Sequence, residues 1–255
     1  MTAGRTVLKY AVAYVDGYDL TGYTRTFGPL TQAFEEADST TLGDAVKNAM
    51  PGQVNINPGT LDTVLDNTTG ATHSLIQSSA ERTLMYAIGG RAAPAQGDPA
   101  FVGTFLQSEF MTTPASGSAV TLSGKFGGWG ATAATLLYNK PWGWLLHAKG
   151  AETAVNTAIG IDDTIAGAAT AAGGYMCYQL FSSNGTVTLK VQHAATNTNV
   201  SFSDLVSSSA ITAAVTPTAG LVALSNTASV SRYIRWQLTF GTATTATFAI
   251  AFVRG

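Results

Sequence analysis

Two stretches near the C-terminus constrain the fold most, because their side chains alternate with a period of two. In Val230–Phe240 the alternate residues Ile234, Trp236, Leu238 and Phe240 share one face. In Thr247–Val253 both sets of alternate residues are apolar. Successive side chains of a strand point to opposite faces, so the pattern predicts antiparallel strands, the second covered on both faces. Whether another subunit supplies one of those covers is left open by the sequence.

Two turn dipeptides organise further strands. Asp16-Gly17 follows a first apolar strand, Val7–Val15. Asn184-Gly185 separates the alternating stretches Tyr175–Phe181 and Thr186–Gln192. Asn-Gly and Asp-Gly between such stretches favour tight turns, because Gly, Asn and Asp tolerate positive φ. We therefore expect a turn after the first strand and a hairpin in the second half.

A long segment without clear periodicity, Tyr18–Thr40, follows the first turn. Irregular segments of this length inside a compact domain are usually functional or interacting loops. This one contains more large apolar residues than a solvated linker would: Tyr18, Tyr23, Phe27, Leu30 and Phe34. We interpret it as an arm whose side chains need a cover. The parent domain and a neighbouring subunit both remain possible covers.

Thr41–Met50 has the pattern of a short amphipathic helix. Leu42, Ala45, Val46 and Ala49 recur at the spacing of one apolar stripe. Thr41 and Asp44 resemble a capping box, and Pro51-Gly52 ends the segment. One or two further helical turns are possible over Thr72–Ser78, around Leu75 and Ile76.

These signals together predict a mainly β fold, an antiparallel β-sandwich or barrel with one short flanking helix at 41–50. A chain of 255 residues suits one large β domain or two in tandem. We expect a first β domain over 1–135, with the arm 18–40 and the helix 41–50, and a second β-sandwich over 136–255. A Gly- and Ala-rich stretch places the boundary between 124 and 150.

Charge is scarce, which bears on partners. Only 11% of residues are charged, against about 25% in typical globular domains, and 45% are apolar. This suits a subunit that hides surface against neighbours, although a neutral β-rich monomer is the simpler alternative. The net charge of −2 gives no basic surface for gripping nucleic acid. Without an apolar leader or a membrane-length apolar run, the chain is expected to fold in a cytoplasm.

No pattern in the sequence predicts catalysis, a metal or a cofactor. His73, His147 and His193 are far apart and lack partners at metal-ligand spacing. The lone Cys177 lies in an apolar strand and is expected to be a buried hydrophobe. The adjacent carboxylates Asp162 and Asp163 do not form an acid–base pair by sequence alone. We therefore expect no enzyme, although a β-rich hydrolase with an unrecognised acidic pair stays open.

Two aromatic groupings have competing interpretations. Arg232 and Arg235 beside Tyr233 and Trp236 could bind nucleic acid or sugar, but we interpret them as arginine stems covering a sheet. Trp142 and Trp144 could form a carbohydrate platform. We expect the stretch Trp144-Leu-Leu to belong to the core instead.

Several stretches resemble tail tube proteins of siphophage-type bacteriophages. Tyr14-Val-Asp-Gly-Tyr-Asp-Leu-Thr-Gly22 is similar to the opening of many such subunits, where a long irregular arm follows. Further similar stretches begin at Pro51 (Pro-Gly-Gln-Val-Asn-Ile-Asn-Pro-Gly-Thr-Leu), Gly97 (Gly-Asp-Pro-Ala-Phe-Val-Gly-Thr-Phe) and Arg232 (Arg-Tyr-Ile-Arg-Trp-Gln-Leu). The resemblance spans most of the chain.

The resemblance implies a structural virion protein of the phage tail, assembled in the host cytoplasm. Its subunits would form trimeric or hexameric homo-oligomeric rings that stack and contact other tail proteins. Phage DNA would pass through without specific binding, and no membrane would be involved. Assembly would rest on the arm and the helix, through Tyr18, Tyr23, Phe27, Leu30, Phe34, Leu42 and Val46. The alternative is a capsid decoration protein or a receptor- or glycan-binding tail protein.

Overall fold

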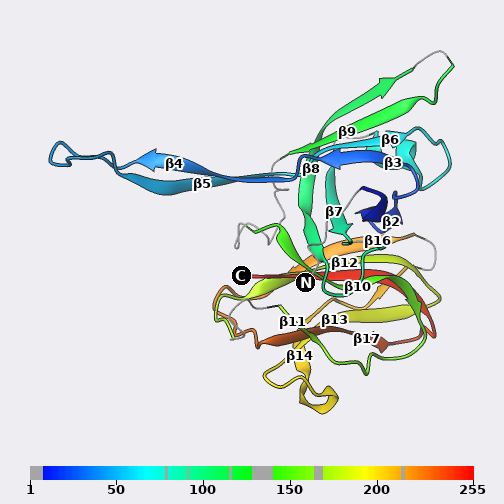
Figure 1. Ribbon diagram of the computed structural model, residues 1–255. Coiled ribbons are helices and arrows are strands. Elements are labelled where there is room, and N and C mark those ends of the chain that lie inside the picture. The colour runs from blue at the N-terminus through cyan, green and yellow to red at the C-terminus, as the bar shows by residue number, and fades with distance from the viewer. Residues whose placement is uncertain are drawn as a thin grey trace.

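The computed structural model describes residues 8–77, 80–90, 92–114, 117–127, 140–163, 169–213 and 216–255, and the fold is mainly β, as predicted (Figure 1). In chain order the elements are η1 (Leu8–Tyr10), β1 (Ala11–Val15), β2 (Tyr18–Asp19), β3 (Thr24–Gly28), β4 (Thr31–Asp38), β5 (Ala49–Asn57), β6 (Gly59–Val64), α1 (Thr72–Ile76), β7 (Glu81–Ile88), β8 (Pro99–Thr113), β9 (Thr121–Gly127), β10 (Trp142–Glu152), β11 (Ile161–Asp162), β12 (Gly174–Ser183), β13 (Thr186–Ala194), η3 (Asn199–Ser201), β14 (Ser203–Ser207), β15 (Ile211–Thr212), β16 (Thr218–Ala223), β17 (Tyr233–Phe240) and β18 (Ala246–Arg254).

The largest sheet runs through both halves of the chain. Within the described ranges it has 11 strands, in the order β16-β12-β18-β10-β8-β7-β1-β2, with β9, β6 and β3 continuing from β8. The long strand β8 pairs with β7 and β10 near its start and with β9 near its end. It therefore joins the strands of the second half to those of the first.

The second half of the chain is an antiparallel sandwich. The strands β16, β12, β18 and β10 form one layer, and a second sheet of β11, β17, β13 and β14 with β15 forms the other. The large side chains of β17 and β13 meet those of β12 and β18 in one buried cluster. As predicted, Ile234, Trp236 and Leu238 face this cluster, with Phe240 packed at its margin. The alternating pattern in the sequence is thus the inner face of a sandwich.

Strand β18 is covered on both faces by its own chain. Phe248, Ile250 and Phe252 point into the sandwich core. Ala249 and Ala251 on the opposite face contact a different cluster, which includes residues of β1, β7 and β8. Small side chains on that face let the two halves of the curved sheet approach closely. The second cover that the sequence left unassigned is therefore the N-terminal half of the same chain.

The N-terminal half has its own core inside a curled sheet. Residues of β1, β6, β7, β8 and β9 enclose a cluster that includes Phe101, Phe105 and Phe126. The helix α1 covers one end of it with Leu75 and Ile76. A Cβ at Gly124 would lie 2.3 Å from Cγ2 of Ile76, so glycine at that position is what lets α1 pack this closely.

A polar latch connects the two halves. The Asp16-Gly17 turn forms as predicted, with φ of 51° and 83°, and it joins β1 to β2. The buried amide of Gln179 on β12 accepts a hydrogen bond from the Gly17 N–H and donates one to the carbonyl of Thr83. Asp19 also pairs with Lys149, at 2.7 Å. The turn that sequence analysis identified thus sits against the sandwich.

The hairpin predicted at Asn184-Gly185 is wrong. Strands β12 and β13 belong to different sheets, because β12 already pairs with β16 on one edge and β18 on the other. The dipeptide instead forms an arch between the layers. The Asn184 carboxamide oxygen accepts hydrogen bonds from the N–H groups of Thr244 and Thr245, in the loop between β17 and β18. That final pair of strands likewise divides between the two sheets rather than pairing with each other.

The helix predicted at 41–50 is wrong, whereas the helical turns considered over Thr72–Ser78 are present as α1. Residues 41–48 form turns and bends, and the one α-helix of the described chain is α1. The Thr41–Asp44 signal is real but closes a turn, since the Asp44 carboxylate accepts hydrogen bonds from the N–H and hydroxyl of Thr41. An isolated helix of ten residues is marginal in water, and no described part of the chain covers Leu42 and Val46 of the apolar stripe.

The division into domains at 124–150 stays a prediction. Residues 128–139, which include much of that boundary, lie outside the described residues. The separate buried clusters of the two halves agree with two hydrophobic cores. The continuous sheet and the third cluster join them in one body.

Candidate assembly interface

The feature that departs most from the compact body is the hairpin of β4 and β5, hereafter the arm (residues 31–57). Its strands pair antiparallel from Thr31 opposite Asn57 to Asp38 opposite Ala49. The ribbon extends away from the rest of the molecule (Figure 1). Only its base joins the body, where Val54 and Ile56 contact the N-terminal core.

The outer part of the arm exposes large apolar side chains. Phe34 is 60% exposed and Met50 58%, and Leu42 and Val46 near the tip are also exposed. Phe34 and Met50 line one shallow hollow of about 440 Å³ with Ala49. Burying a side chain of this size is worth about 1.5–3 kcal/mol, and an isolated two-stranded hairpin is marginally stable. The arm therefore gains much from a cover that its own chain does not supply within the described residues.

The arm is acidic. It contains four carboxylates (Glu35, Glu36, Asp38, Asp44) against one ammonium, Lys47, a formal charge of −3. Hydrogen bonds from Thr40 lower the pKa of Asp38, and those from Thr41 lower the pKa of Asp44. Both caps keep negative charge at the tip.

The structure divides the residues predicted for assembly into two groups. Tyr18, Tyr23, Phe27 and Leu30 pack against the N-terminal core and are partly buried. Phe27 stacks on Tyr86 with the ring centroids 4.6 Å apart. Phe34, Leu42 and Val46 are exposed on the arm. The predicted arm, 18–40, thus begins too early and ends too early, because its first half is needed by the body.

Met50 is the exposed arm residue that sequence analysis missed. It was assigned to the end of a helix, whereas it pairs with Ala37 in the hairpin. The alternation Val54-Asn-Ile-Asn was visible as a strand, and extending it backward past Pro51-Gly52 was the available signal.

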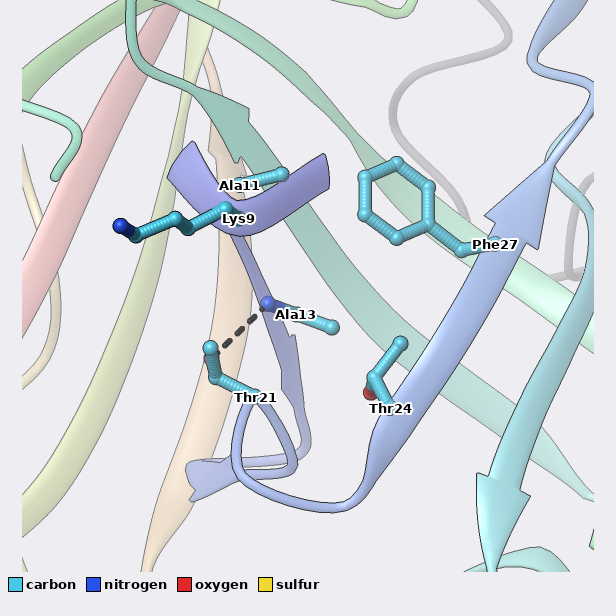
Figure 2. A pocket seen from close by; sticks show the side chains of 6 residues that line it. All are labelled: Lys9, Ala11, Ala13, Thr21, Thr24 and Phe27. Atoms are coloured by element: carbon cyan, nitrogen blue, oxygen red, sulfur yellow. Dashed lines mark hydrogen bonds between the residues drawn. The ribbon is translucent and has the colours of Figure 1, made fainter. Parts of the chain in front are cut away.

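A small cavity lies at the seam of the curled sheet, between β1 and β3 (Figure 2). Its volume is about 210 Å³, and Ala11, Ala13, Thr24 and Phe27 contribute to its lining. Thr21 Oγ1 accepts a hydrogen bond from the Ala13 N–H at 3.1 Å. The side chain of Lys9 extends away from Phe27 (Figure 2). This lining has no pair of groups suited to acid–base or nucleophilic chemistry.

Two shallow hollows adjoin on the outer face of β3, β6, β8 and β9, with volumes of about 300 and 320 Å³. Both are lined by Asp62 and Ser123. Asp62 accepts hydrogen bonds from the hydroxyls of Thr26 and Ser123. Arg25 lines the first hollow and Lys125 the second. We call this surface the outer face; its lining is rich in hydroxyls and contains charges of both signs.

The histidines have neighbours of a structural kind. His147 stacks on Phe248, and its ring nitrogens lie 3.1 Å from the Phe248 carbonyl oxygen and 3.0 Å from Glu152 Oε1. His193 Nδ1 accepts a hydrogen bond from the Ser231 N–H. Burial lowers the pKa of His193, and the charge of Arg254 lowers it further. The described residues contain no group of three or more side chains able to hold a metal ion.

The adjacent carboxylates Asp162 and Asp163 each pair with an arginine. Asp162 meets the exposed Arg232 at 2.6 Å, and Asp163 is bound through both oxygens by Arg254. Burial raises the pKa of Asp163, while the hydrogen bonds from Arg254 oppose this. Asp163 therefore anchors the sandwich through a buried ion pair, whereas Asp162 forms an exposed pair at its surface.

The interpretation of the arginine grouping is supported at Arg235, and the core prediction for Trp144-Leu-Leu is wrong at Trp144. Arg235 is buried against Phe202 and bonds Gln192, Asn199 and the Ala158 carbonyl, as a structural arginine should. Trp144 was expected in the core, yet it is 37% exposed, and Trp142 is 39% exposed. Both lie at the start of β10, and the buried positions that follow are taken by Leu145 and Leu146.

Comparison with protein-family models and with curated protein sequences finds no match. Among solved structures, one similar chain comes from the work titled "Crystal Structure of SPP1 Dit (gp 19.1) Protein, a Paradigm of Hub Adsorption Apparatus in Gram-positive Infecting Phages". The alignment covers 96% of this chain and 99% of that chain, with 10% identity and a TM-score of 0.34. Neither value is high enough to assign a family or a role. In the described part of the chain, no helix has the length and apolar character to cross a membrane.

Proposed function

We propose that the chain is a structural subunit of a bacteriophage tail that assembles with copies of itself into rings. The finer proposal is a major tail tube protein, whose trimeric or hexameric rings stack into a conduit for phage DNA. The protein then belongs to the virion, is assembled in the host cytoplasm and contacts other tail proteins, with no catalytic role and no membrane.

The observation that carries this proposal is the arm. The arm exposes four large apolar side chains: Phe34, Leu42, Val46 and Met50. The body, in contrast, covers both faces of β18. This contrast is typical of a segment that binds another molecule. Burying these four side chains corresponds to about 6–12 kcal/mol before the costs of association. Assembly through the arm supplies that burial.

The low charge of the chain supports the same proposal. With 11% charged residues and a net charge of −2, the protein offers little to hold DNA phosphates. A conduit needs such a surface, because strong binding would stop the DNA. The sequence resemblance to tail tube proteins is the remaining support.

Electron microscopy of the concentrated protein tests the proposal. We expect hollow tubes or stacked rings from the natural chain. A shortened chain, with residues 36–51 replaced by Asn-Gly, keeps Val54 and Ile56 in the core and should stay folded by circular dichroism but remain monomeric. Single rings that never stack would contradict the proposed tube but would still support assembly into rings. Unchanged polymers from the shortened chain would overturn the role of the arm.

A matched pair of substitutions separates the arm from exposed apolar residues in general. Met50→Ser on the arm should raise the concentration needed for assembly by about tenfold or more, because one buried side chain is lost from each contact. Val200→Ser removes an apolar side chain that is more exposed than Met50, 93% against 58%, on η3 of the sandwich. It should leave assembly unchanged.

A receptor- or glycan-binding tail protein is the second candidate, favoured by Trp142 and Trp144. Both indoles begin the same strand and present more than a third of their surface. Exposed aromatic rings can stack on the apolar faces of sugars. Titrating tryptophan fluorescence with fragments of bacterial surface polysaccharide tests this role. Saturable quenching that Trp144→Ala abolishes would support it, and a flat response would leave the assembly role alone.

A further inference from the structure

We infer that the acidic arm of one copy docks on the outer face of β3, β6, β8 and β9 of a second copy, against Arg25 and Lys125. This inference rests on the proposed self-assembly and adds the surface that receives the arm.

The distribution of ion pairs points to these cations. From Lys149 to Arg254 every charged side chain in the described residues has a polar or ionic partner within the molecule: Lys149, Glu152, Asp162, Asp163, Lys190, Asp204, Arg232, Arg235 and Arg254. A partner that binds a sandwich charge must therefore compete with a contact already present within the molecule.

The N-terminal half differs. Arg25 is exposed and forms no ion pair with any described residue. Lys125 is 55% exposed, and its nearest carboxylate, Glu109, is 4.0 Å away. A contact at that distance between exposed groups contributes little. Both cations are thus available to the arm, whose formal charge is −3.

The shape of the outer face suits a ribbon. The two hollows beside Arg25 and Lys125 share Asp62 and Ser123 in their linings, so they adjoin as one groove across the strands. Met111, 50% exposed, also lines the groove and offers an apolar contact to Phe34 and Met50 of the arm. Strand β3 pairs only with β6 among the described strands, so its outer edge is open beside this groove.

Two carboxylates also lie on this face and must be counted. The hydroxyls of Thr26 and Ser123 hold Asp62 between the hollows, and Glu109 is the loose partner of Lys125. Docking lays strand β4, which carries Glu35 and Glu36, across Arg25 and Lys125, and a carboxylate of the arm replaces Glu109 as the partner of Lys125. The formal charges of Arg25, Lys125, Asp62 and Glu109 sum to zero, so the individual pairs with Arg25 and Lys125, rather than the net charge of the face, select it.

Charge reversal within one chain tests the inference. Glu35→Lys with Glu36→Lys reverses the arm, and Arg25→Glu with Lys125→Glu reverses the face. Each pair of changes should raise the critical concentration for assembly by about tenfold or more in low salt, because like charges then meet. The chain with all four changes should assemble within about threefold of the natural protein.

The controls keep the outcomes distinct. Lys190→Glu with Arg232→Glu reverses two sandwich cations and should leave assembly unchanged. Circular dichroism and urea unfolding confirm that each variant folds, and Arg25→Gln with Lys125→Gln is the milder replacement should the reversed face unfold. Normal assembly of the variant with the reversed face would contradict the proposed docking surface. So would a variant with all four changes that stays monomeric. The shortened arm tests the proposed function separately, since its result does not depend on which face receives the arm.

Discussion

The arm and the sandwich are both built from antiparallel strands, yet the apolar side chains are buried in the sandwich and exposed on the arm. In the sandwich, Phe248 and Ile250 of β18 are covered by a second sheet, and the small residues between them by the N-terminal half. In the arm, Phe34 and Met50 lie on a ribbon two strands wide. The charges follow a similar division: the sandwich forms ion pairs, whereas no ion pair involves a residue of the arm among the described residues. The number of layers that cover a pair of strands, rather than the pattern of its side chains, therefore decides how much apolar surface stays exposed for a partner to bury.

The largest effect within the body should come from the buried ion pair. Arg254→Met leaves the Asp163 carboxylate, 0% exposed, without its guanidinium. We expect a loss of about 3–5 kcal/mol in the free energy of unfolding, because an uncompensated charge remains buried. Urea unfolding of the shortened-arm chain measures this without assembly.

The neighbouring pair is the control for that variant. Arg232→Met breaks the contact with Asp162. The side chain of Arg232 is 42% exposed and that of Asp162 is 32% exposed. An exposed pair is worth about 0–1 kcal/mol. Equal losses from the two variants would contradict the distinction between a buried and an exposed ion pair.

A smaller effect is expected at the latch between the halves. Gln179→Leu removes the acceptor of the Gly17 N–H. It also removes the side-chain N–H that donates a hydrogen bond to the Thr83 carbonyl. A buried group left unpaired costs about 1–3 kcal/mol. The loss should appear in urea unfolding while the arm still supports assembly. A variant that assembles poorly but unfolds normally would show that the latch acts on the interface instead.

The smallest effect concerns His193. Burial lowers its pKa in the folded state, so the unfolded state binds the proton more readily. This residue's contribution to stability is therefore present above the unfolded pKa, about 6.5, and is lost as the pH falls through the folded pKa. Unfolding free energies at pH 7.5 and 5.5 should differ less in His193→Asn than in the natural chain. If the natural chain and His193→Asn show the same pH dependence of the unfolding free energy, that dependence belongs to other groups.

Alternation along the strands made the β fold predictable, but long-range pairing was not. Ile234, Trp236 and Leu238 face the core as the sequence indicates. The Asn184-Gly185 signal failed because a local turn preference cannot reveal that β12 already has partners on both edges. Gly185 also lacks the positive φ that the tightest hairpin turn needs.

The candidate interface was half predictable for a similar reason. The excess of large apolar residues over Tyr18–Thr40 marked a segment in need of a cover. Phe27 found that cover on Tyr86 of its own chain, whereas Phe34 did not. The helical spacing of Leu42 and Val46 was misleading, because an apolar stripe predicts a helix only where a surface lies ready to bury it.

Hydrogen exchange of the arm amides tests the central claim most directly. In dilute, monomeric protein the amides of β4 and β5 beyond Phe34 should exchange within seconds, while those of β17 and β18 stay protected. In concentrated, assembled protein the arm amides should become protected and the sandwich should not change. Arm amides equally protected at both concentrations would contradict the claim that a neighbouring copy completes the arm.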